Sequence, residues 1–345
     1  MIHPPKPYPL VYIVVLNWNN YDDTSTCLQS LLNLTYPSVR IVLVDNASTD
    51  GSIKRLQEEF SLCRFVLNEA NLGFARGCNR GIQAALEDKD CAYVLLLNND
   101  ARISNDALEK AIPFADADST LGLVGGKILS SSTAAKTIWY AGGRIDRWRG
   151  RAVVRGFGEV DRGQYDSPCE VGFVTGAMML IKRVVIEDAG LLPEEYFFGI
   201  EEWDFSLQVK RAGYKLYYFP ELLAHHRADG SHWNYDPKFV YNSYRSKLIF
   251  QEKYLPGFMF ALWKCVFQVY GKYLARRIRR RLIRRRGFDP QGQVQLDDLD
   301  FALTKALEDH GRNALSENVL TAFEAELHAR RPTSQSQPSR SPVVS

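Results

Sequence analysis

The stretch VLLLNND, residues 94–100, is an apolar run that ends in three polar side chains. Such runs are typical of strands buried on both faces, and others occur at residues 11–16 (VYIVVL), 39–45 (VRIVLVD) and 63–68 (CRFVLN). Helical spacing of apolar residues separates them, for example around residues 75–87. This alternation predicts an α/β fold with a mostly parallel central sheet and helices on both faces.

The organisation of the chain changes after this first half. We expect residues 1–235 to form one domain, with one half over about residues 10–130 and a second, loop-rich half over 131–235. Residues 236–330 are predicted to form a C-terminal helical extension. Residues 331–345 have the polar composition of a disordered tail.

Charge and cysteine usage limit the compartment and the partners. Net charge is +3, but eight arginines and no acid fall between Arg276 and Arg286. An interfacial helix with a basic end predicts contact with an anionic membrane surface; a solvated basic helix is the alternative, and no nucleic acid is expected without a base-stacking module. The six cysteines show no paired spacing, and no signal peptide or long apolar run is present, which favours the cytoplasm.

Polar residues follow the second apolar run in VDNASTDGS, residues 44–52. Ser48 to Asp50 can cap the next helix, and capping alone would explain them. Asp45, with Asn46 beside it, is not needed for a cap. A carboxylate at a strand end can accept the imide N–H of uracil or thymine.

A glycine-rich segment, NLGFARGCNRGI, covers residues 71–82. Its spacing is not GxGxxG, which disfavours a dinucleotide fold. Gly73 permits a close backbone approach, and Arg76 and Asn79 would fall at a helix start, where N–H groups and a cation favour phosphate. A helix start with small packing residues is the alternative.

Asp100 is a single carboxylate flanked by amides at the end of a buried strand. Mg²⁺ or Mn²⁺ needs oxygen ligands and commonly takes only one or two from protein, with phosphates and water supplying the rest. One carboxylate therefore suits a metal that arrives with a diphosphate. An Asp in an Asn-rich turn without a metal is the alternative.

Two more polar pairs lie in the second half of the domain. Glu201 and Glu202 open a predicted helix beside aromatic residues, where burial can raise a carboxyl pKa enough to make a general base. Favourable interaction with the helix dipole would also explain either acid. His225 and His226 follow a strand, and spacing alone does not decide between metal binding and packing.

Taken in order, several of these segments resemble the family-2 glycosyltransferases with a GT-A fold, particularly the bacterial rhamnosyltransferase-like branch. The resemblance spans roughly residues 10–250 and rests on the segments VVLNWNN, VDNASTDGS, NLGFARGCNRGI, LLLNND, VTGAMMLIKR and FFGIEEWDFSLQVKRAG and on the region of His225 and His226. It implies a nucleotide-binding first half and an acceptor-binding second half.

The resemblance also implies roles for single residues. Asp100 would be the metal-binding acid of NND, which stands in place of the DXD motif. Glu202 would be the catalytic base with Glu201 beside it, and His226, then His225, would be auxiliary metal or diphosphate ligands. The nucleotide-sugar donor would be held by Leu16, Asn17, Trp18, Asn19, Asp45, Asn46, Asn71, Gly73, Phe74, Arg76, Asn79, Asn98 and Asn99.

The implied activity is an inverting, metal-dependent hexosyl transfer, with rhamnose suggested by the family branch, from a dTDP or UDP donor. The acceptor would be a cell-surface polysaccharide of cell wall or lipopolysaccharide type, or its lipid-linked precursor, at the inner face of the cell membrane. One alternative is a sugar-phosphate nucleotidyltransferase, which would need a Gly-rich basic loop where this chain reads NWNNYDD. The other is an inactive carbohydrate-binding relative.

Overall fold

The computed structural model divides the chain into two compact units, Met1–Asp229 and Gly230–Ser345. The predicted tail at 331–345 lies outside the described residues, and the predicted boundary after residue 235 falls at the edge of another such segment. The structure describes residues 8–131, 136–227, 236–286, 290–311 and 315–330, with the backbone alone at 272, 274–286 and 290–296.

The first unit alternates strands and helices along the chain and then adds short strands. Its elements are β1 (Leu10–Asn17), α1 (Tyr21–Leu32), β2 (Val39–Asp45), α2 (Ser52–Glu59), β3 (Arg64–Leu67), α3 (Gly73–Leu86), β4 (Cys91–Asn98), β5 (Ala101–Ile103), α4 (Ala107–Asp116), β6 (Leu121–Ser130), β7 (Thr137–Tyr140), β8 (Gly143–Asp146), β9 (Arg151–Val154), β10 (Cys169–Glu170), β11 (Met178–Lys182), α5 (Arg183–Ala189), α6 (Glu201–Arg211) and β12 (Lys215–His226).

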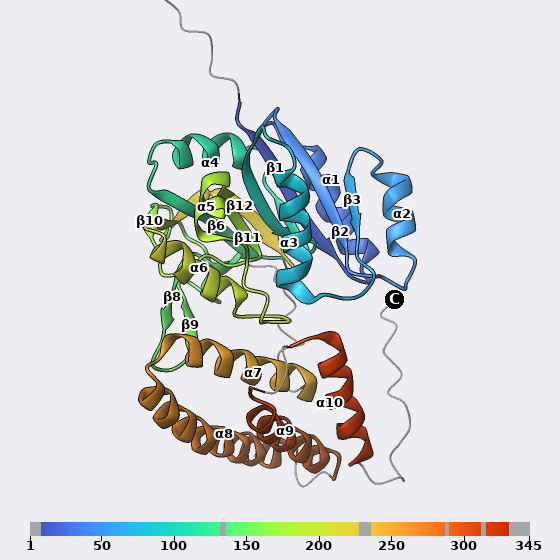
Figure 1. Ribbon diagram of the computed structural model, residues 1–345, viewed down its shortest axis with the longest axis vertical. Coiled ribbons are helices and arrows are strands. Elements are labelled where there is room, and N and C mark those ends of the chain that lie inside the picture. The colour runs from blue at the N-terminus through green and yellow to red at the C-terminus, as the bar shows by residue number, and fades with distance from the viewer. Residues whose placement is uncertain (1–7, 132–135, 228–235, 287–289, 312–314, 331–345) are drawn as a thin grey trace, which may run out of the picture. The chain divides into compact units, whose positions relative to one another are not determined.

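One large sheet forms the centre of this unit, with strand order β10-β12-β6-β11-β4-β1-β2-β3 (Figure 1). Strand β1 pairs in parallel with β2 and β4, and β2 pairs in parallel with β3. Strand β11 lies antiparallel between β4 and β6, and β12 is parallel to β6. The longest strands therefore run in one direction, which confirms the predicted α/β fold with a mostly parallel sheet.

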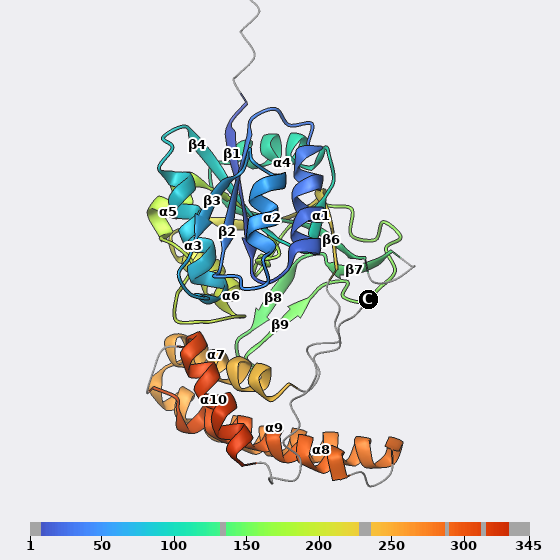
Figure 2. The same cartoon turned by 90° about the vertical axis from the view of Figure 1, so that its right-hand side faces the viewer.

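Helices cover both faces of the sheet. The chain steps from β1 to β2 to β3 in one direction through α1 and α2, and then returns past β1 to β4 through α3. Because βαβ crossovers are right-handed, the reversal places α3 on the face opposite α1 and α2 (Figure 2). The reversal between β1 and β4 is also the point where ligands of open α/β sheets bind.

Helix α3 lies close to the sheet because two of its three glycines, Gly77 and Gly81, face the strands. A Cβ atom on Gly81 would lie 2.3 Å from Val14 Cγ1 and 2.8 Å from Val44 Cγ2. A Cβ atom on Gly77 would lie 2.7 Å from Leu16 Cδ1. The glycine-rich segment thus provides packing as well as a helix start.

Three segments of the chain are each divided between two elements. The apolar run over 170–182 forms β10 and β11, and between them Val174 donates its N–H to Ser206 Oγ instead of to a neighbouring strand. The predicted helical extension is broken after Tyr254, where Pro256 restricts the preceding residue. Within residues 298–329 the structure describes parts of two helices.

The second unit consists of helices, and α7 packs against α9, α8 and α10. Tyr241 on α7 stacks on Phe323 of α10 with ring centroids 4.2 Å apart. In the described part of the chain, no helix combines the length and the apolar character that a membrane span requires. The elements are α7 (Pro237–Tyr254), α8 (Gly257–Arg286), α9 (Pro290–Glu308) and α10 (Glu317–Ala329).

The close packing of α3 is testable with Gly81→Ala. The added methyl has no space beside Val14 and Val44, so we expect the free energy of unfolding to fall by about 1–3 kcal/mol in urea titrations. Gly257→Ala is the control, because a Cβ at Gly257 meets no atom within 4 Å. Equal stability of the two variants would contradict the packing described here.

Candidate active site

The carboxyl ends of three neighbouring parallel strands bring polar residues into one row. Asn17 of β1 pairs with Asp45 of β2, and Leu16 of β1 pairs with Asn98 of β4. The sequence marks Asp45 and the NND segment at separate strand ends, and the family resemblance adds Leu16 and Asn17. The pairing of the strands places them at the same edge of the sheet.

A hydrogen-bond network joins the ends of β1, β2 and β4. Asn17 Nδ2 donates to Asp45 Oδ1 at 2.9 Å and to Ser48 Oγ at 3.1 Å. On its other side, Asn17 Oδ1 accepts from Thr24 Oγ1 at 2.9 Å, and Thr24 accepts from Asn99 Nδ2 at 2.8 Å. Asp45 is buried, and its Oδ2 accepts the N–H of Ser48 at 2.9 Å. The network fixes the backbone around the row.

The turn after β1 leaves one large side chain on the surface. Asn19 has a left-handed backbone with φ of 50°, its N–H donates to Ser48 Oγ at 2.9 Å, and its Oδ1 accepts the N–H of Thr49 at 2.7 Å. Leu16 points toward α3 at Gly77. Trp18 remains 49% exposed beside this fixed turn.

The start of α3 is tied to the loop before α6. Asn46 Nδ2 donates to the carbonyl of Gly73 at 3.0 Å and to Asn71 Oδ1 at 3.2 Å. Gly73 has φ of +78°, and a Cβ there would lie 2.3 Å from the carbonyl oxygen of Phe197. Phe74 donates its N–H to that carbonyl at 2.8 Å. Two features therefore require glycine at position 73: its positive φ and the close approach of the Phe197 carbonyl.

Two predicted phosphate-binding residues on α3 contact the same loop. Asn79 is buried; its amide donates to Leu192 O at 2.8 Å and to Glu194 Oε1 at 2.9 Å, and it accepts the N–H of Leu192 at 3.0 Å. The structure thus places Asn79 inside the protein as a link between α3 and this loop. Arg76 Nε lies 3.7 Å from Glu194 Oε2, and its side chain is 36% exposed.

Asp100 and His226 meet at the end of β12. Asp100 Oδ1 lies 2.8 Å from His226 Nε2, and Asn98 Nδ2 lies 3.2 Å from the same nitrogen. The carboxylate oxygen is buried and has no aligned hydrogen bond despite this short contact. If Nε2 accepts the amide hydrogen of Asn98, it carries no hydrogen itself, so no proton lies between this nitrogen and Asp100 Oδ1.

Asp100 and His226 alone offer fewer ligands than a metal centre formed entirely by protein side chains needs. Among the described residues, no group of three or more His, Cys, Asp or Glu side chains could hold a metal ion. His225 pairs with Arg102 of β5 instead of facing Asp100, and burial, Arg102 and Lys136 lower its pKa. The structure therefore brings His226, and not His225, to Asp100.

Glu201 and Glu202 begin α6 in a strained and dry environment. Ile200, the residue before them, has φ of 83°, which is rare and costly for a β-branched residue. Burial raises the pKa of both carboxyl groups, and that of Glu201 rises well above its ordinary value, with a further contribution from the Glu202 charge. The interaction between the two carboxyl groups raises the pKa of Glu201 and lowers that of Glu202, which favours the proton on Glu201.

Two contacts connect the glutamate pair to the NND segment. Asn98 donates its N–H to the carbonyl of Ala177 at 3.0 Å. At Gly176, one residue earlier, a Cβ atom would lie 4.0 Å from Glu202 Cβ and 3.0 Å from Phe74 Cε1. The short segment before β11 therefore brings the two acidic groups to the same edge of the sheet.

Sequence reasoning missed several residues at this edge. Asp204 is fully buried, and its Oδ2 accepts a hydrogen bond of 2.8 Å from the Tyr196 hydroxyl. This bond holds the loop before α6. The third acid in EEWD was a visible signal for it. Trp139 lies with its ring centroid 4.7 Å from that of His226. No local pattern marks a contact between residues so far apart in the chain.

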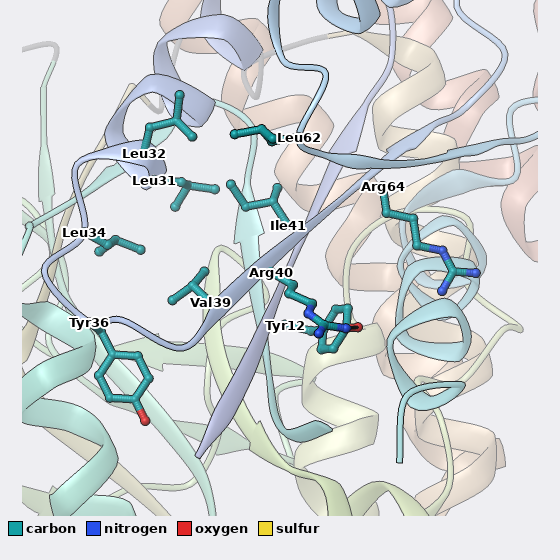
Figure 3. Close-up of a pocket in the computed structure, with 10 residues that line it drawn as sticks. All are labelled: Tyr12, Leu31, Leu32, Leu34, Tyr36, Val39, Arg40, Ile41, Leu62 and Arg64. Carbon is teal, nitrogen blue, oxygen red and sulfur yellow. Dashed lines mark hydrogen bonds between the residues drawn. The ribbon is translucent and has the colours of Figure 1, made fainter. Parts of the chain in front are cut away.

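A separate hollow of about 480 Å³ lies at the opposite edge of the sheet (Figure 3). It is lined by Tyr12, Val39 and Arg40 at the amino ends of β1 and β2 and by leucines such as Leu31 and Leu62. Amino ends of parallel strands are not where such sheets bind ligands. The hollow contains none of the predicted site residues.

The burial of Glu201 predicts a pH-dependent stability. A raised pKa in the folded state means that wild-type stability decreases as pH rises from the ordinary glutamate value through the raised one. The Gln side chain of Glu201→Gln cannot ionise. The difference in melting temperature, Glu201→Gln minus wild type, should therefore be a few degrees larger at pH 8 than at pH 5. Glu170→Gln, at a side chain 53% exposed, is the control. An offset for Glu201→Gln that is the same at both pH values would contradict the assignment.

Comparison with known proteins places this arrangement in a family. The N-acetylglucosaminyl-diphospho-decaprenol L-rhamnosyltransferase of Mycobacterium tuberculosis is 25% identical over 217 residues, 58% of this chain and 71% of that protein. The poly-beta-1,6-N-acetyl-D-glucosamine synthase of Staphylococcus epidermidis is 24% identical over 213 residues, 60% of this chain and 47% of that protein.

A solved structure shows the same fold. The crystal structure of GalNAc-T7 with UDP, GalNAc and Mn²⁺ superposes with a TM-score of 0.57 at 17% identity, covering 95% of this chain and 59% of that one. The fold is therefore that of the GT-A glycosyltransferases. The family model described as glycosyl transferase family 2 matches residues 12–190, which is more than half of the chain. The chain belongs to glycosyl transferase family 2.

Proposed function

We propose that this glycosyltransferase inverts the anomeric centre while it moves a hexose, rhamnose in the first instance, from a dTDP or UDP donor. The acceptor is a hydroxyl of a cell-surface polysaccharide or of its lipid-linked precursor. The observation that carries the proposal is the pair of acidic groups, Asp100 with His226 and Glu201 with Glu202, connected through Gly176 and Ala177. The name of the mycobacterial relative supports the sugar and a diphospholipid acceptor.

The donor is held at the row of strand ends in the first half of the unit. Trp18 is exposed beside the fixed turn and would stack on the base, and the second lone pair of Asp45 Oδ2 would accept the imide N–H. Phe74 and Arg76 at the start of α3 would flank the sugar and the diphosphate, where N–H groups and a cation favour phosphate. Asn79 would act indirectly by holding Leu192.

A divalent cation, Mg²⁺ or Mn²⁺, fits the donor set at Asp100. The buried Oδ1 without a hydrogen bond and the adjacent His226 nitrogen supply two ligands, and such ions usually complete their coordination with phosphate oxygens and water. The Mn²⁺ named with the structurally similar GalNAc-T7 supports the choice. When bound, the cation would stabilise negative charge on the departing nucleoside diphosphate.

Glu202 is the general base in this proposal. Burial and the neighbouring Glu202 charge raise the pKa of Glu201 well above its ordinary value, so Glu202 would be the group that accepts the proton of the acceptor hydroxyl. As that proton moves to Glu202, the oxygen forms a bond to the anomeric carbon and the bond to the diphosphate oxygen breaks. The electron pair leaves on the diphosphate, beside Arg76.

Two alternatives have less support. An inactive carbohydrate-binding relative would have no need for a strained Ile200 before a buried Glu201 and a half-buried Glu202. A sugar-phosphate nucleotidyltransferase would need a basic glycine-rich loop after β1, whereas that turn is closed by Asn19 and Ser48. Both alternatives predict no transfer of sugar to an acceptor hydroxyl.

The metal role of Asp100 is testable by donor binding. In calorimetric titrations with UDP or dTDP, Mn²⁺ should strengthen binding to wild type, and Asp100→Asn should weaken the Mn²⁺-dependent binding by about 10- to 100-fold, the usual effect of losing a metal-site group. Asp106→Asn, at a carboxylate 52% exposed in a surface ion pair, is the matched control and should match wild type. Undiminished Mn²⁺ stimulation in Asp100→Asn would refute the metal site.

The base is testable with the same substitution at two adjacent residues. Glu202→Gln should lower kcat by about 10²–10⁴-fold while donor binding is retained, because only proton transfer is lost. Glu201→Gln keeps an amide donor toward Glu202 and should retain kcat within about tenfold. A larger loss of kcat in Glu201→Gln than in Glu202→Gln would assign the base to Glu201. If neither variant lost activity, neither glutamate would be the base.

The activity of wild type should also decrease as pH falls through the pKa of Glu202, which burial raises above the ordinary glutamate value. The residual activity of Glu202→Gln should lack this acid limb. An acid limb that persists unchanged in Glu202→Gln would show that another group controls it.

A further inference from the structure

Helix α8 carries an unusual exposed surface. Among the described residues, six of the sixteen large apolar side chains that are exposed lie on this helix, within one stretch of sixteen residues. The remaining ten are scattered over the first unit. The six are Phe258, Leu262, Val266, Val269, Tyr270 and Tyr273, which are 53–78% exposed.

Helical spacing places these side chains on one face. At 100° per residue, Phe258, Leu262, Val266 and Val269 follow each other at intervals of three or four residues, which share a face of a helix. Ala261 and Cys265 are also exposed and fall within the same face. We name this surface, formed by the exposed residues between Phe258 and Tyr273, the α8 apolar face.

The opposite side of α8 is already packed inside the second unit. Phe267 is buried, with its ring 4.4 Å from that of Trp263 and 4.7 Å from that of Tyr244 on α7. Phe260 lies 5.6 Å from the ring of His310. A helix usually buries its apolar residues toward the core, so a second apolar side facing outward indicates an external partner.

Charge along the same helix identifies the kind of partner. The sequence of α8 contains two lysines, eight arginines and no acidic residue, and the arginines all follow the α8 apolar face. A second copy of this chain would bring two such basic segments together. An anionic bilayer offers hydrocarbon to the apolar side chains and phosphate to the cations, and aromatic residues such as Tyr270 and Tyr273 suit its interface.

We propose that the α8 apolar face is a membrane-docking surface that lies in the interface of an anionic lipid bilayer, parallel to its plane. The helix does not span the bilayer, since α8 lacks the apolar character of a span over its described residues. Binding has two parts: the arginine-rich end attracts the anionic leaflet from solution, and the apolar side chains then enter between the head groups. The first part is screened by salt and the second is not.

This proposal extends the proposed function, because an enzyme held at the bilayer meets a lipid-linked acceptor without diffusing through water. It does not depend on the catalytic assignment. Transfer to a soluble acceptor and docking to lipid are separate measurements, so failure of one leaves the other standing.

The native chain offers a probe inside this surface. Cys265 is exposed on the α8 apolar face, whereas the thiols at 27, 63, 78 and 91 are buried and that at 169 is half-buried. An environment-sensitive dye such as NBD attached at Cys265 reports entry into hydrocarbon. We expect a blue shift and protection from aqueous iodide with vesicles of phosphatidylcholine and phosphatidylglycerol, and a much weaker response with phosphatidylcholine alone.

The decisive comparison uses two pairs of Val→Glu substitutions. Val266→Glu with Val269→Glu removes two apolar contacts and should weaken vesicle binding in co-sedimentation by at least about tenfold, since burying one valine contributes about 1.5 kcal/mol or more. Val160→Glu with Val184→Glu, at residues 43% and 44% exposed in the first unit, is the control of equal charge and should bind as wild type does. Both variants should keep transfer to a soluble acceptor.

Three results would overturn the proposal. Wild type could fail to bind anionic vesicles at low salt, or the two double variants could bind equally well. A concentration-dependent blue shift at Cys265 without lipid, together with a dimer in analytical ultracentrifugation, would show that a second copy covers the α8 apolar face.

Discussion

The site of this glycosyltransferase depends on one backbone contact, the hydrogen bond of 2.8 Å from the Phe74 N–H to the Phe197 carbonyl. It joins the start of α3, where we propose that the donor binds, to the loop that ends in the strained Ile200 and the glutamate pair. Only glycine at position 73 allows it, because any Cβ would lie 2.3 Å from that carbonyl oxygen. Asn79 and Leu192 make a second link between the same two segments.

This connection suggests why binding and chemistry belong to one centre. A donor bound as proposed at the start of α3 would rest on the same backbone that positions α6, so the glutamate pair would have a fixed relation to it. The strain at Ile200 and the desolvation of Glu201 both cost stability, and the contacts around them offset that cost. Such local costs are typical of functional sites.

The sequence predicted the strand ends to within one residue, because each apolar run stops near the end of its strand. Asp45 and the NND segment were found in this way, the family resemblance added Asn17, and parallel pairing brings these residues together. The break between β10 and β11 could not be predicted, since an apolar run reports burial and not the hydrogen-bond partner of Val174. The inward direction of Asn79 and the contact of Trp139 with His226 depend on tertiary packing, which local patterns do not encode.

The central claim is that Asp100 holds a cation on the diphosphate while Glu202 faces the acceptor from the other side of the donor sugar. It is tested most directly by anomalous diffraction from crystals grown with Mn²⁺ and a non-hydrolysable nucleotide sugar. The account predicts one manganese peak about 2.1 Å from an Asp100 oxygen and from diphosphate oxygens, with the Glu202 carboxylate nearest the anomeric carbon. A peak bound elsewhere, or a donor whose anomeric carbon points away from Glu202, would contradict it.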